Sequence, residues 1–276
     1  MKFIEDYCIS YTNNSDLYGY SISNIFDDVS IYIMPMVNPD GVDLVTGNIL
    51  KTSNAFLTAK NIANDFPDIA FPNRMEGKYT SELIWICSFL LDGIMQKKSN
   101  MLKGLINLLH VILLDIGPLT EPESLSIYNF TLIHDFRLII SFHTQGKEIY
   151  WNFQNINPPQ GYEIGEKFAE SSGYVLADVP YNSSFAGYKD WFIQNFNKPG
   201  FTIEAGIGEN PLSIEQFDTI YYDNLGILVL GSVLWILKIF LCCMYFRQSF
   251  SFSFAKMFLY QFLYRREGLL WQKKNF

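Results

Sequence analysis

Short apolar runs alternate with longer amphipathic stretches along most of this chain. Three runs rich in β-forming residues predict buried strands, at 30–37, 137–142 and 201–206. Stretches with apolar residues at helical spacing predict four helices, at 124–134, 162–172, 185–196 and 214–230. Strands that alternate with helices predict an α/β fold, in which helices cover both faces of one sheet.

Turn and capping residues mark the ends of several predicted elements. The sequence Asn-Pro-Asp-Gly at 38–41 ends the first strand with strong turn chemistry. Thr120 is the expected N-cap of the helix that begins with Glu121-Pro122-Glu123 and continues over 124–134, and Gly173 is the expected C-cap of the helix at 162–172. In an α/β sheet, polar residues at the strand ends usually belong to the functional site. His143 and Glu204 follow or end two of the predicted strands.

Two stretches do not follow these patterns. Residues 75–116 combine the apolar run Trp-Ile-Cys-Ser-Phe-Leu-Leu, a lysine cluster and an almost wholly aliphatic segment. Residues 231–276 are aromatic and basic, with seven Lys or Arg residues and one Glu. We therefore predict one domain over 1–230 that contains an anomalous block at 75–116, followed by a tail over 231–276.

Composition narrows the function classes. Hydrophobic residues make up 49% of the 276 residues, and the net charge of −8 combines a tail of +6 with a body of −14. An acidic body argues against nucleic acid as a partner. Cys8, Cys87, Cys242 and Cys243 form no regular framework, which argues against a disulfide scaffold or a cysteine zinc site. We expect no secretory signal at the start of the chain.

Three residues are candidates for chemistry. His143 follows a buried strand and is a candidate zinc ligand, although a structural histidine bonded to backbone is the alternative. Glu204 lies in an apolar strand and is a candidate general base, unless it is a capping or ion-paired carboxylate. Tyr181 is either a phenol on a mobile loop or an ordinary surface tyrosine.

The order of these features is more specific than any one of them. Asn-Pro-Asp-Gly at 38–41, His-Thr-Gln-Gly at 143–146, a loop Tyr181 and Thr-Ile-Glu-Ala-Gly at 202–206 occur in one sequence. Together they resemble the zinc carboxypeptidases, and more narrowly the bacterial γ-D-glutamyl-L-diamino acid endopeptidases that cut cell-wall stem peptides. The resemblance covers about two thirds of the chain, over 12–73 and 117–230.

The resemblance implies a mixed sheet with helices on both faces, zinc as the cofactor and a peptide or peptidoglycan stem peptide as the substrate. It makes His143 the last of three zinc ligands. Glu204 would activate the zinc-bound water and then protonate the leaving amine. Tyr181 would close over the substrate.

The resemblance also implies that parts are missing. In the family a His-x-x-Glu pair supplies the other two zinc ligands, and it belongs before the segment that this chain begins with. We therefore expect the first strands and first helix of the family domain to be absent, zinc not to be retained, and the chain to be inactive. Our hypothesis for 75–116 is that this block is translated in a shifted reading frame, because alternative frames can encode three family motifs in the correct order.

Two other functions stay open at this point. A catalytically inactive relative can still bind cell-wall peptides. Alternatively, the apolar segment at 225–246, interrupted by Lys238, is nearly long enough to span a bilayer and would associate the chain with a membrane. The interpretation that we prefer for this segment is a family C-terminal helix followed by unrelated translated sequence. The resemblance to bacterial enzymes leaves both the cytoplasm and the cell envelope open as locations.

Overall fold

The computed structural model describes most of the predicted domain. The described residues are 1–37, 39, 42–43, 47–54, 56–57, 119, 122–179, 187–209 and 212–234, with the backbone of 239–243. The anomalous block at 75–116, Tyr181 and Thr120 lie outside the described residues.

A six-stranded mixed sheet forms the centre of the fold, in the strand order β3-β8-β4-β7-β5-β6. The pairs in this sheet are parallel except for the antiparallel pair of β5 and β7. A separate two-stranded sheet pairs β1 with β2. The strands are β1 (Asp16–Leu17), β2 (Tyr20–Ser21), β3 (Ile31–Met34), β4 (Leu138–His143), β5 (Glu148–Tyr150), β6 (Val175–Ala177), β7 (Gly200–Glu204) and β8 (Ile239–Cys243).

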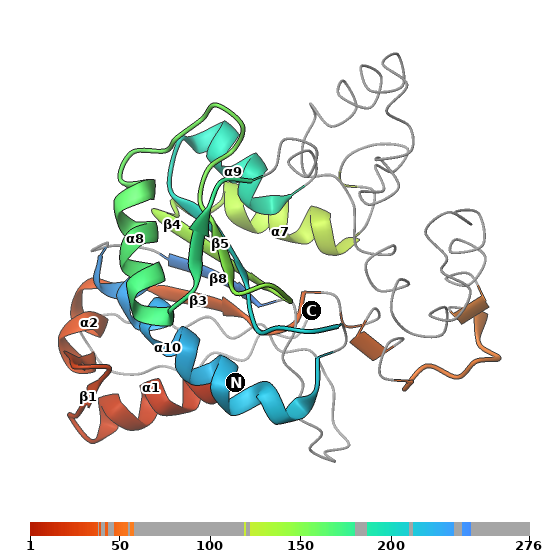
Figure 1. Ribbon diagram of the computed structural model, residues 1–276, viewed down its shortest axis with the longest axis horizontal. Helices are drawn as coiled ribbons and strands as arrows, with labels where there is room; N and C mark the ends of the chain where they lie inside the picture. The colour runs from red at the N-terminus through yellow and green to blue at the C-terminus, as the bar shows by residue number, and fades with distance from the viewer. Residues whose placement is uncertain are drawn as a thin grey trace.

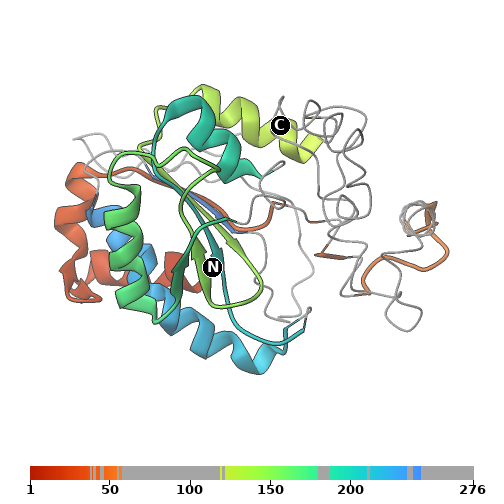
Figure 2. The ribbon, with the colours of Figure 1, turned by 45° about the horizontal axis from the view of Figure 1, so that its top comes forward.

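Helices cover both faces of the large sheet (Figures 1 and 2). One layer contains α1 (Lys2–Thr12), α2 (Ile22–Asp28), α8 (Gly161–Ser172) and α10 (Phe217–Val233). The opposite layer contains α7 (Pro122–Leu132) and α9 (Tyr188–Phe196). A short 3₁₀ helix, η3 (Ile214–Gln216), precedes α10. The predicted α/β fold with a mixed, doubly covered sheet is confirmed.

Strand β4 separates the two halves of the core. Leu138, Ile140 and Phe142 pack into the cluster beneath α1, α2, α8 and α10. Ile139, between them in sequence, packs into the cluster beneath α7 and α9. Successive side chains of a strand point to opposite faces, so a strand buried on both faces must be apolar at almost every position. This requirement explains the continuous apolar run that predicted the strand.

Most predicted elements lie within a few residues of the observed ones. The helix predicted at 214–230 begins as η3 and continues as α10. Gly173 is confirmed as a C-cap: its φ is 72°, and its N–H bonds the carbonyl of Ala169. No element was predicted for α1, α2, β5, β6 or β8. Strand β8 lies in the segment that the sequence sets apart as a tail, and the domain boundary at residue 230 stays a prediction.

Among the described residues, no helix has the length and apolar character required to cross a bilayer.

The contact between α8 and the sheet gives a direct test of the core. Phe168 and Phe201 are both fully buried, and their ring centroids lie 4.9 Å apart at an interplanar angle of 64°. We predict that Phe168→Ala lowers the free energy of unfolding by roughly 3–5 kcal/mol, because less apolar surface is then buried on folding and a cavity remains in the core. Urea denaturation measures this change. Leu132→Ala is the matched control: Leu132 is 52% exposed, so its loss should change stability by less than about 0.5 kcal/mol. Equal effects of the two substitutions would contradict the described core.

Candidate active site

The carboxyl ends of β4 and β7 bring the two predicted catalytic residues together. His143 and Glu204 are register partners at the last position of this parallel pair. The amide of Ala205 donates a hydrogen bond to the carbonyl of His143 at 2.8 Å and extends the pairing past the strand ends. Register partners on neighbouring strands present their side chains to the same face of a sheet. His143 and Glu204 therefore share one face of this sheet edge.

The imidazole of His143 is in the form that binds metals. Burial lowers the pKa of His143 to about 4, so the ring is neutral at pH 7. A neutral imidazole offers a nitrogen lone pair to a metal, whereas an imidazolium does not. Among the described residues the ring has no hydrogen-bond partner, whereas the backbone carbonyl of His143 accepts from the amide of Ala205. Whether His143 is a zinc ligand or a structural histidine, the two interpretations given by the sequence, stays a prediction.

Strand β5 adds a second carboxylate that the sequence analysis did not identify. Glu148 is the antiparallel register partner of Glu204, so His143, Glu204 and Glu148 lie in one row across three neighbouring strands. The hydroxyl of Tyr150 donates to Glu148 Oε2 at 2.5 Å. Burial, followed by this hydrogen bond, raises the pKa of Tyr150, which therefore stays a protonated donor. The sequence pattern that could have predicted this strand is the alternation of the polar Glu148 and Tyr150 with the apolar Ile149 between them.

The turn between β4 and β5 is tied to the end of β7. The amide of Gly146 donates to the carbonyl of Gly206 at 2.9 Å, and the amide of Lys147 donates to the carbonyl of Glu204 at 2.7 Å. Gly146 has a φ of 148°, which side chains rarely adopt, so glycine suits this position. These bonds fix the backbone on both sides of the row.

A buried polar cluster lies next to the segment that contains Tyr181. Val179, just before that segment, donates its amide to Asn152 Oδ1 at 3.1 Å. Lys189, just after it, donates to the carbonyl of Asn152 at 2.5 Å and forms an ion pair with Asp190. Burial raises the pKa of Asp190. Asn152 therefore connects the two described ends of this segment, while Tyr181 itself lies outside the described residues.

The sequence analysis gave Lys189 and Asp190 no role beyond their place in the helix predicted at 185–196. In the structure both are 3% exposed. The helical spacing alone gave no reason to expect a buried ion pair, because a charge on a helix usually marks its solvated face.

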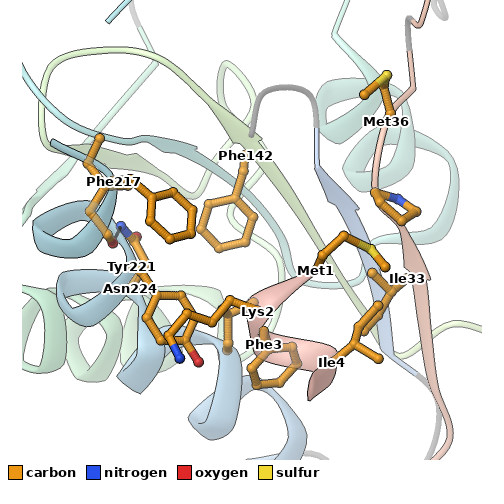
Figure 3. Close-up of a pocket in the computed structure, with 13 residues that line it drawn as sticks. Met1, Lys2, Phe3, Ile4, Ile33, Met36, Phe142, Phe217, Tyr221 and Asn224 are labelled. Carbon is orange, nitrogen blue, oxygen red and sulfur yellow. Dashed lines mark hydrogen bonds between the residues drawn. The ribbon is translucent and has the colours of Figure 1, made fainter. Parts of the chain in front are cut away.

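An apolar cavity of about 130 Å³ lies on the other face of the sheet (Figure 3). It is enclosed by the start of α1, the ends of β3 and β4, and α10. Phe142 lines it and precedes His143 in β4, so the two side chains point to opposite faces. The described lining includes neither His143 nor Glu204, so this cavity is separate from the row of polar residues.

The family of this chain follows from its similarity to known proteins. Residues 1–225 match the model of the family described as zinc carboxypeptidase. The chain belongs to the zinc carboxypeptidase family.

Two relatives agree with this assignment. Gamma-D-glutamyl-L-diamino acid endopeptidase 1 of Lysinibacillus sphaericus is 36% identical over 237 residues, which cover 84% of this chain and 56% of the relative. Uncharacterized protein YqgT of Bacillus subtilis (strain 168) is 32% identical over 232 residues, which cover 83% of this chain and 58% of the relative. The chain thus spans little more than half the length of these relatives.

One solved structure has a weaker likeness. Bovine thrombin-activatable fibrinolysis inhibitor, solved in complex with tick carboxypeptidase inhibitor, has a TM-score of 0.39 and 15% identity. The match covers 45% of this chain and 48% of that one.

The family implies zinc, but the described donors do not complete a zinc site. Over the described ranges, no three His, Cys, Asp or Glu side chains are grouped so that they could hold a metal ion. His134, the other described histidine, uses Nδ1 in a 2.6 Å hydrogen bond with the carbonyl of Phe130 and lies against Phe136. A catalytic zinc site typically has three protein ligands. The described part of this zinc carboxypeptidase-family chain therefore does not fit the metal by itself.

The buried ion pair beside the site gives the second prediction. We predict that Lys189→Met lowers the free energy of unfolding by about 3–5 kcal/mol, because it leaves the Asp190 carboxylate buried without its cation. The control is Lys198→Met, which removes the ion pair with Asp135, a residue whose side chain is 69% exposed. An exposed pair contributes at most about 1 kcal/mol. Urea denaturation of both variants makes the comparison, and a Lys189→Met chain as stable as Lys198→Met would refute the buried pair.

Proposed function

We propose that this chain is a peptidase-type domain for γ-D-glutamyl-diaminopimelate peptides of peptidoglycan, and that it does not hydrolyse them by itself. The observation that carries the proposal is the register pairing of His143 with Glu204 on one face of the sheet edge. The 36% identity with a gamma-D-glutamyl-L-diamino acid endopeptidase supports the choice of substrate class.

Each site residue has a role in this proposal. In a complete family site, Glu204 would be the carboxylate that accepts a proton from water and returns it to the leaving amine. His143 would contribute one neutral nitrogen to the metal, and the described residues do not supply the remaining ligands. Tyr181, which lies outside the described residues, would contact the bound peptide. Glu148 and Tyr150 add polar side chains on β5. A charged or amide-rich peptide that lies along His143, Glu204 and Glu148 can therefore form hydrogen bonds with them.

The rate acceleration that a general base provides alone is too small for turnover. A positioned general base contributes roughly 10²–10⁴-fold to a rate, whereas enzymes typically accelerate reactions by roughly 10⁶–10¹⁷-fold. A metal supplies the missing part by polarising the carbonyl and acidifying the water. The described donors do not complete such a metal site, so Glu204 alone is insufficient for peptide hydrolysis at a measurable rate.

The first test measures turnover. The tripeptide L-Ala-γ-D-Glu-meso-diaminopimelate is incubated with the full chain, with and without added zinc, and release of diaminopimelate is followed by chromatography. We expect no release above that of the Glu204→Gln variant. Zinc-dependent release that disappears in Glu204→Gln would contradict the predicted inactivity and would leave the substrate assignment intact.

The second test measures binding by the same full chain. Isothermal titration calorimetry with this tripeptide should detect binding that is at least about tenfold tighter than that of the α-linked peptide L-Ala-L-Glu-L-Lys, a difference of about 1.4 kcal/mol. Equal affinity for the two peptides, or no binding of either, would overturn the proposed substrate class.

A further inference from the structure

Strand β8 occupies a position that the family region of the chain leaves open. Strands β3 and β4 both lie within residues 1–225, which match the family, whereas β8 begins at Ile239. Strand β8 lies between them and is parallel to both. Neighbouring strands are about 4.8 Å apart, so β3 and β4 are separated by about 9–10 Å and cannot bond each other directly.

The open position would be unstable without an occupant. Four residues of β3 and five of β4 pair with β8. With β8 in place, Leu138, Ile139 and Ile140 of β4 are 0% exposed. Without β8, this edge of an apolar strand would have no protein partner for its backbone groups. Buried backbone N–H and C=O groups that lack partners destabilise a fold by an amount comparable to a lost hydrogen bond each. The slot between β3 and β4 therefore requires one extended segment.

The composition of Ile239–Cys243 and its short connection to α10 suit this slot. Its sequence, Ile-Phe-Leu-Cys-Cys, carries no charge and is apolar throughout, as expected for a parallel strand inside a sheet. It follows α10 after only five residues, 234–238, which limits how far it can reach. The two relatives have more than 40% of their length without a counterpart in this chain.

We propose that the slot between β3 and β4 is a binding site for one parallel β-strand, and that Ile239–Cys243 is a substitute strand supplied from outside the family region. Main-chain hydrogen bonds on both edges provide the binding, as in other cases of strand addition. The proposal is independent of peptidase function, because it concerns the completion of the sheet and not the chemistry at its edge.

Cross-linking in the full chain tests the position of the segment. Met34 and Cys242 are Cα partners in β3 and β8, at a spacing that a disulfide can bridge. With Cys8, Cys87 and Cys243 replaced by Ser, Ser and Ala, Met34→Cys should form an intramolecular disulfide with Cys242 on oxidation, identified by mass spectrometry. In the control Thr202→Cys, the thiol lies two strands from β8 and should form no such bond.

Two results of the cross-linking experiment would overturn the proposal. The first is the absence of the bond in Met34→Cys. The second is a disulfide-linked dimer, because it would show that the strand comes from a second copy of the chain.

Hydrogen exchange tests the requirement for the strand. Leu241→Pro removes a backbone N–H from the middle of β8, which a central strand does not tolerate. Amides of Ile31–Met34 should then exchange at least about tenfold faster than in the unsubstituted chain. Global unfolding of Leu241→Pro alone would support the proposal as well, because it would show that the sheet needs this strand. Unchanged exchange in Ile31–Met34 would overturn it.

Discussion

The hydrogen-bond ladder of β4 is the constraint on which the rest of this fold depends. Strand β4 pairs with β7 on one edge and with β8 on the other, and its side chains contribute to the core on both faces. Its register with β7 brings the last residues of the two strands, His143 and Glu204, to one edge. A shift of one residue would send one of these side chains to the opposite face, because side chains alternate along a strand. Packing of the core and placement of the site are thus fixed by the same set of bonds.

The local pattern of apolar and polar residues was sufficient to predict the helices and strands around this ladder. The apolar run of β4, the helical spacing of α8 and the capping Gly173 each depend on neighbouring residues in the sequence, and each was predicted close to its observed place. His143 and Glu204 could be singled out because they follow apolar runs. Their proximity follows from a general property of parallel sheets, in which the carboxyl ends of the strands meet at one edge.

Long-range pairing was not predictable in the same way. Glu148 is a partner of Glu204 only because β5 runs antiparallel to β7, a pairing that nothing in the short Glu-Ile-Tyr sequence indicates. Lys189 and Asp190 form an ion pair and are each 3% exposed in α9, which the helical spacing at 185–196 does not indicate. Strand β8 is paired with β4 across about one hundred residues of sequence, and its apolar composition did not distinguish it from the rest of the tail over 231–276.

The site combines a neutral imidazole and two neighbouring carboxylates with an incomplete set of metal donors in the described residues. This combination is the basis of our proposal that the chain, a member of the zinc carboxypeptidase family, does not hold zinc and does not turn over by itself. Zinc stoichiometry tests this account most directly. After equilibrium dialysis of the full chain against micromolar zinc at pH 7, the account predicts far less than about one zinc per chain, with no difference between the chain and His143→Ala. About one tightly held zinc per chain that is lost in His143→Ala would contradict it.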